Sequence, residues 1–135
     1  MKNYNNDVYE WINRAESNLE RARIGKDSPK ILLEDLCFDC HQCVEKSLKA
    51  LLISNNIEFP KTHSINLLIN LLKEKINFFP EFVLESVILT DYAVEMRYPG
   101  NYEKITSVDY FNAYQIALRV FEWAKSIINN ETLFN

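Results

Sequence analysis

Residues 40–52 read Cys-His-Gln-Cys-Val-Glu-Lys-Ser-Leu-Lys-Ala-Leu-Leu, and they lie inside a longer stretch with helical periodicity. Apolar residues return there every three or four positions, the spacing that gathers side chains on one face of an α-helix. We predict that this helix starts at Ser28-Pro29, with Ser as the cap and Pro in the first turn, and that it ends near Asn55. Its predicted buried stripe is Leu32, Leu36, Cys40, Val44, Leu48 and Leu51.

The same periodicity predicts a long helix on each side of this one. The first begins at Asn6 or Asp7 and ends at Gly25, and the last begins at about Ser107. The predicted buried faces are Val8, Trp11, Ala15, Leu19 and Ala22 in the first, and Tyr110, Tyr114, Ala117, Phe121, Ala124 and Ile128 in the last.

Shorter helices are predicted between residues 62 and 96. Thr62 is expected to cap a third helix, and Pro80 to open a fourth that breaks and resumes at Thr90-Asp91, as far as Met96. The third helix is expected to carry Ile65, Leu68, Leu71, Leu72 and Ile76. Short connections favour antiparallel neighbours. We therefore expect one all-α domain over 1–135, with an ordered core of about 7–130, folded as an up-and-down four-helix bundle with an additional short helix.

Composition narrows the class of protein. The 135 residues include only two Gly, which disfavours a sheet built from many tight turns. A net charge of −4 gives no sign of the basic face typical of proteins that bind duplex nucleic acid. No stretch resembles a signal peptide or approaches the ~20 apolar residues of a membrane helix. The three Cys are interpreted as reduced thiols, which predicts a cytoplasmic protein.

Cys37, Cys40 and Cys43, with His41 among them, have a spacing that resembles a metal motif. They lie in the middle of a predicted helix, however, where the three thiols span too wide an arc for one ion. The only other His is His63, so the ligand set is incomplete. We predict that no metal binds and that Cys40, and with it Cys37, serves as a small core side chain.

The polar face of the same helix carries Gln42, Glu45, Lys46 and Lys49, which project side by side. One interpretation is a phosphate site made by two ammonium groups and an amide. The other is a solvated face with a Glu45–Lys49 pair, and periodicity alone favours that one.

Two further features invite a functional interpretation. Arg97 is followed by Tyr98, Pro99 and a Gly, a rigid turn that would hold a guanidinium ready for phosphate. Its alternative role is to cap the carbonyls of its own helix. His63 would need a partner in reach to act as an acid or base, and packing at a helix start is the simpler role. No phosphate loop or nucleophile motif occurs, so no catalytic residue and no cofactor is assigned.

Three segments together resemble the HEPN family: residues 40–52, residues 61–65 (Lys-Thr-His-Ser-Ile) and residues 92–99, which end in Arg-Tyr-Pro. The resemblance covers nearly the whole chain. It implies a bundle similar to the C-terminal domain of kanamycin nucleotidyltransferase. It also implies nucleotide binding, dimers, and a partner such as the minimal nucleotidyltransferases found in toxin–antitoxin and related modules.

One branch of the family consists of metal-independent ribonucleases, whose signature is an Arg followed after four to six residues by a His. Here Arg97 is followed at those positions by Tyr102, Glu103 and Lys104, and no His occurs after His63. A Tyr, with an ordinary pKa near ~10, is a poor substitute for His in proton transfer. The departure predicts that the chain has no ribonuclease activity.

The expected function is therefore a non-catalytic module that binds a nucleotide or a nucleotidyltransferase. The alternatives are a divergent RNA-cleaving toxin that uses Arg97 with Tyr102, and a purely structural dimer. A homodimer is expected because two Trp, eight Phe and seven Tyr are many for this chain to bury alone. The predicted phosphate ligands are Gln42, Lys46, Lys49 and Arg97, with His63, Tyr98 and Tyr102 as secondary candidates.

Overall fold

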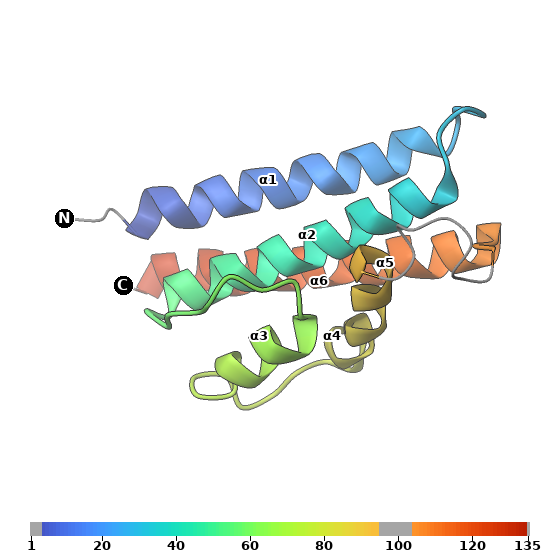
Figure 1. Ribbon diagram of the computed structural model, residues 1–135. Helices are drawn as coiled ribbons and strands as arrows, with labels where there is room; N and C mark the ends of the chain where they lie inside the picture. Colours follow the sequence, from blue (N-terminus) through green and yellow to red (C-terminus); the bar gives the residue numbers. More distant parts are fainter. Residues whose placement is uncertain (1–3, 95–103, 135) are drawn as a thin grey trace.

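The computed structural model describes residues 4–94 and 104–134, and every regular element in these two ranges is a helix. Three long helices, α1 (Tyr4–Gly25), α2 (Leu33–Ser54) and α6 (Ser107–Phe134), lie side by side, and α1 runs opposite to the other two (Figure 1). The fourth side is made of short pieces: α3 (Ile65–Leu72), α4 (Glu81–Glu85), the 3-10 helix η1 (Ser86–Leu89) and α5 (Thr90–Val94). The predicted all-α fold is confirmed.

Helix α2 is the central element of the bundle, in contact with α1, α3, α5, η1 and α6. From Leu36 to Leu52 its side chains are buried except at Phe38, Gln42 and Lys46. These three follow at intervals of four residues, so they form one narrow open stripe along an otherwise enclosed helix. Of the residues predicted to be buried in α2 and α6, Leu32 is exposed and Tyr114 is half-buried. The others are buried, among them Leu36, Cys40, Val44, Leu48, Phe121 and Ala124.

The predicted start of α2 is wrong. Helix α1 ends at Gly25 as expected, but Ser28 and Pro29 form a turn closed by a hydrogen bond from Ile31 N to Ser28 O (3.2 Å). Ser in the first and Pro in the second position suit a type I turn as well as a helix start. The helix begins only at Leu33, and Leu32 is 60% exposed rather than part of the buried stripe.

The starts of the later helices agree with the sequence except at α3. Thr62 accepts a hydrogen bond from Ser64 N (3.0 Å), and Ser64 itself caps α3 by accepting from Leu67 N (3.2 Å). Ile76 lies beyond the end of α3 but packs against the core. Helix α4 follows Pro80, and α5 restarts at Thr90, as predicted, while the predicted end at Met96 lies outside the described residues.

Helix α6 is fixed at its first turn by a reciprocal cap that the sequence analysis did not use. Thr106 Oγ1 accepts from Asp109 N (3.1 Å), and Asp109 Oδ2 accepts from Thr106 N (2.9 Å). This is the Thr-x-x-acid arrangement of a capping box. Of the helices formed by the described residues, none combines the length and apolar character needed to cross a bilayer.

Candidate functional site

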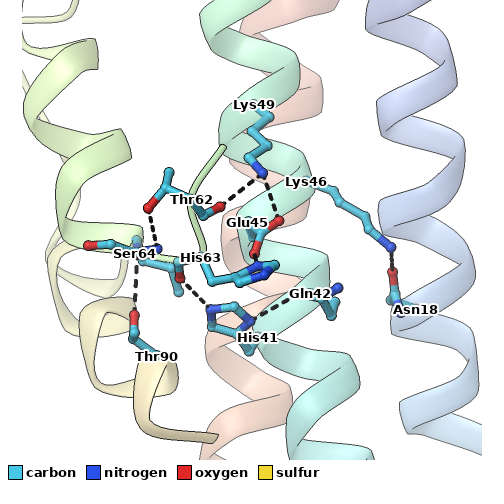
Figure 2. Close-up of polar contacts among 11 residues, drawn as sticks. Asn18, His41, Gln42, Glu45, Lys46, Lys49, Thr62, His63, Ser64 and Thr90 are labelled. Carbon is cyan, nitrogen blue, oxygen red and sulfur yellow. Dashed lines mark hydrogen bonds and ion pairs between the residues drawn. The ribbon is translucent and has the colours of Figure 1, made fainter. Parts of the chain in front are cut away.

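The first polar cluster joins α1 to α2 through Asn18. This side chain is 7% exposed, and its amide oxygen accepts from Lys46 Nζ at 2.7 Å. Its amide nitrogen donates to Asp39 Oδ1 at 2.9 Å. The Lys46 ammonium is thus held by a neutral amide, and it reaches across from α2 to α1 (Figure 2).

Two arginines stand on the same face of α1 as Asn18, because they lie four positions before it and three after it. Arg14 pairs with Glu10 at 3.0 Å, and both side chains are largely exposed. Arg21 lies 3.6 Å from Asp39 Oδ2 and is also exposed. We call Arg14, Arg21 and Lys46 the cationic face.

The pKa shifts of Lys46 and Asp39 report on the charges around the cationic face. Burial lowers the pKa of Lys46, Glu45 opposes that shift, and the positive charges of Arg14 and Arg21 lower the pKa further. Burial also raises the pKa of Asp39, against the hydrogen bond from Asn18 and the charge of Arg21. The charge of Asp39 also raises the pKa of Lys46, but no ion pair joins Lys46 to a carboxylate among the residues that the structure describes.

The second polar cluster lies on the other flank of α2 and is centred on Glu45. Its carboxylate is almost fully buried, and it accepts from Lys49 Nζ at 2.9 Å and from His63 Nδ1 at 2.8 Å. Lys49 also donates to the Thr62 carbonyl at 3.0 Å, and its ammonium lies 5.4 Å from the centre of the Trp11 ring. Figure 2 shows Lys49 and Glu45 turned toward the 62–63 segment, away from Lys46.

His41, on α2, contacts the backbone of the same 62–63 segment (Figure 2). It is fully buried, with Nε2 2.9 Å from the carbonyl oxygen of His63 and Nδ1 3.2 Å from Gln42 Oε1. Burial lowers its pKa, and the hydrogen bond to the His63 carbonyl opposes the shift. His41 is therefore a buried side chain that connects α2 to the backbone of His63.

The polar face predicted as solvated is instead largely buried. The Glu45–Lys49 pair exists, but its side chains are only 4% and 8% exposed, because the 62–63 segment folds over them. Lys46 and Lys49, expected to point the same way, take different partners: Lys46 donates to Asn18 of α1, and Lys49 donates to Glu45 and to the Thr62 carbonyl. Of the four polar residues predicted for this face, Gln42 and Lys46 belong to the open stripe of α2, and Glu45 and Lys49 are buried. His63 has the nearby partner that an acid–base role requires, and its side chain is 68% exposed.

Three of the predicted ligands, Arg97, Tyr98 and Tyr102, lie outside the described residues. The structure adds four polar residues that the sequence analysis missed: Arg14, Asn18, Arg21 and Asp39. The signal available in the sequence was the i, i+4, i+7 spacing of the first three beside the buried stripe of α1.

The three thiols are core groups. Cys37, Cys40 and Cys43 are fully buried and form no disulfide, which extends the predicted core role to Cys43. Burial raises the pKa of both Cys37 and Cys43 to about 12 and shifts that of Cys40 upward as well. Within residues 4–94 and 104–134, no three His, Cys, Asp or Glu side chains are grouped so that they could hold a metal ion.

Comparison of this chain with known protein families and solved structures identifies the family to which it belongs. The model of the HEPN domain matches residues 8–127. The crystal structure of ST0689, an archaeal HEPN homologue, has 31% sequence identity and a TM-score of 0.72, over 95% of this chain and 99% of that one. TT1696 from Thermus thermophilus shares the fold, with 22% identity and a TM-score of 0.76 over 88% of this chain and 96% of that one. The search of curated proteins found no match. Because the domain match spans most of the sequence and its helices, the chain belongs to the HEPN domain family.

Proposed function

We propose that this HEPN-domain protein is a nucleotide-binding module without a catalytic step of its own, and that the nucleotide's phosphates bind at the cationic face. The observation that carries the proposal is the hydrogen bond of 2.7 Å from Lys46 to the neutral amide of Asn18. A lysine needed only for stability would more simply be paired with a carboxylate, as Lys49 is with Glu45.

Among the described charged residues of these two clusters, Lys46 is the cation that no carboxylate pairs. Glu10 pairs with Arg14, Asp39 pairs with Arg21, and the Glu45 carboxylate is bound by Lys49. An ammonium has three donors, and the described contacts of Lys46 use one of them. Its remaining donors, with the exposed guanidinium groups beside it, suit phosphate oxygens, which accept several charge-assisted hydrogen bonds at once.

Gln42 supports the same site from the open stripe of α2. Its amide group lies 3.2 Å from His41 Nδ1, and Gln42 is one of the partly open residues of α2. Gln42 precedes Lys46 by one helical turn, a rise of about 6 Å, which is within the length of a nucleotide. The order along the stripe is thus an amide and then an ammonium, suited to two different parts of one ligand.

The absence of catalysis rests on the sequence, because no His follows His63 and Arg97 therefore lacks the proton-transfer partner of the ribonuclease signature. A binding module of this kind would work beside an enzyme that makes or consumes nucleotides. A minimal nucleotidyltransferase is the partner that we propose, in a toxin–antitoxin or related module.

The proposal is tested by thermal unfolding with ATP, ADP, AMP, adenosine and inorganic phosphate. A ligand that binds only the folded chain raises its stability, by about 2.7 kcal/mol at a hundredfold excess over its Kd. We expect the phosphorylated nucleotides to raise Tm and adenosine to have little effect. The rise should be lost in Lys46→Gln, which can keep a donor toward Asn18, and retained in Lys75→Gln, which removes the same charge from an exposed site. No rise with any nucleotide, or an equal rise in both variants, would contradict the proposal.

A further inference from the structure

A pocket of about 570 Å³ lies at one end of the bundle, between the start of α1, the end of α2 and the connector between α2 and α3. Figure 1 shows these parts of the two long helices side by side. The volume falls within the ~300–1,000 Å³ that is typical of sites for small molecules. None of the residues that line the pocket belongs to the cationic face. This pocket therefore does not rest on the proposed nucleotide site, and either site can fail without the other.

Two aromatic rings form part of the wall, Trp11 of α1 and Phe59 of the connector, and both are only half-buried. The fold already places an ammonium group beside both rings. Lys49 Nζ lies 5.4 Å from the centre of the Trp11 ring and 5.7 Å from the centre of the Phe59 ring. The negative face of an aromatic ring attracts such cations, and rings arranged around one point are the groups with which proteins recognise ammonium ligands. The aromatic wall of this pocket therefore suits a cation.

The charges that line the pocket have one sign. Asp7 and Glu58 belong to the lining, and no Lys, Arg or His does. Neither carboxylate forms an ion pair with another side chain in the part of the chain that the structure describes. The positive charge of Lys49, beside the two rings, is offset by the Glu45 carboxylate at 2.9 Å. A cation that enters the pocket therefore meets two carboxylates that are still able to take a partner.

The rest of the lining narrows the chemistry of the ligand. It includes Ile53 and Ile57, apolar side chains that suit methylene groups rather than a hydrated metal ion. An anionic ligand would be repelled by the two acids, and an uncharged apolar ligand would cover the carboxylates without pairing them, which costs free energy. A pocket with aromatic and aliphatic walls and two carboxylates fits a ligand whose ammonium groups are joined by a methylene chain.

We propose that this pocket binds an aliphatic polyamine, with its ammonium groups paired to Asp7 and Glu58 and its chain packed against Trp11 and Phe59. Each ammonium donates charge-assisted hydrogen bonds to a carboxylate, the stronger class of hydrogen bond. The two acids come from different segments, the first turn of α1 and the connector after α2. A bound polyamine therefore joins these segments and stabilises the folded chain.

The first test is fluorescence titration of the full chain. Trp123→Phe leaves Trp11 as the only Trp and keeps an aromatic ring beside Phe79. In this variant, putrescine and spermidine should change the Trp11 emission along a saturating curve. Butanediol, which is as long as putrescine but uncharged, and sodium chloride at matched ionic strength should not. Butylamine, with a single ammonium, should bind at least about tenfold more weakly than putrescine. No saturable change with either polyamine, the same change with salt, or equal affinity for butylamine would overturn the proposal.

Calorimetric titration with spermidine then tests the residues, with wild type as the reference. Glu58→Gln should raise the Kd at least about tenfold because it loses a charged hydrogen bond, and Phe59→Leu about threefold because it loses a cation–π contact. Glu74→Gln and Phe78→Leu make the same changes at exposed positions outside the pocket and should match wild type. Circular dichroism checks that each variant is folded. A Kd for Glu58→Gln no higher than that for Glu74→Gln would show that spermidine does not bind in this pocket.

Discussion

Nδ1 of His63 lies 2.8 Å from Oε1 of Glu45, so an exposed imidazole is anchored to a carboxylate that is only 4% exposed. The other oxygen of the same carboxylate accepts from Lys49, whose ammonium also binds the Thr62 carbonyl. The connector before α3 is thereby fastened to the central helix through polar groups. The consequences for stability can be measured.

Lys49→Met should be strongly destabilising. It leaves the buried Glu45 carboxylate without its ammonium partner, and breaking a buried pair from one side costs about 3–5 kcal/mol. The measurement is the free energy of unfolding in urea. Arg14→Met is the matched control, because its pair with Glu10 has the same i, i+4 spacing but is 63% exposed on both sides, and such pairs contribute about 0–1 kcal/mol. Equal losses in the two variants would show that burial of the Glu45–Lys49 pair does not matter.

The buried His41 should make stability depend on pH. Burial lowers its pKa below the ordinary value of 6.5, so below that pH the unfolded chain takes up a proton more readily than the folded one. The free energy of unfolding should therefore fall as the pH drops from 6.5 to about 5. His41→Gln can keep a donor for the His63 carbonyl but cannot titrate, so its stability should change less over this range. Parallel pH profiles for the two proteins would contradict this assignment.

The thiols should be inert while the chain is folded. Burial raises the pKa of Cys37 and of Cys43 to about 12, and the thiolate is the reactive form. Labelling with an aromatic disulfide reagent at mildly alkaline pH should be slow in buffer and rapid for all three Cys in denaturant. Rapid reaction of even one thiol in buffer would mean that the centre of α2 opens easily.

Gly25 should resist substitution although it ends a helix. A Cβ added there would clash with Cδ2 of Leu36, which is only 2% exposed. We expect Gly25→Ala to cost about 1–3 kcal/mol, the range for overpacked sites. In a Leu36→Val background the same substitution should cost clearly less, because the clashing methyl group is gone. An unchanged cost would point to the backbone of Gly25 rather than to packing.

The parts of the fold that the sequence could predict are those set by local periodicity. Leu36, Val44 and Leu48 recur at helical spacing, so their burial follows from the helix itself. The start of α2 could not be placed, because Ser28-Pro29 suits a turn as well as a helix cap, and the choice depends on how α2 meets α1.

The candidate site was harder to predict because its contacts join distant parts of the chain. Asn18 bonds Asp39 and Lys46, which are 21 and 28 positions away. Glu45 and Lys49 have the i, i+4 spacing that is typical of ion pairs on a solvated helix face. They are buried because the segment with Thr62 and His63 packs over this part of α2. The spacing of residue types predicted the helix α2 correctly. It did not predict which neighbouring segment each polar side chain of α2 would contact.

The most direct test of the account is a calorimetric titration of the nucleotide that raises Tm most into wild type, Lys46→Gln and Lys75→Gln. If Lys46 binds phosphate, one nucleotide should bind per chain, and the Kd of Lys46→Gln should rise at least about tenfold, consistent with the loss of a charged hydrogen bond worth about 1.5–3 kcal/mol. Lys75→Gln should match wild type. Equal affinity of wild type and Lys46→Gln would contradict the assignment of the cationic face as the nucleotide site.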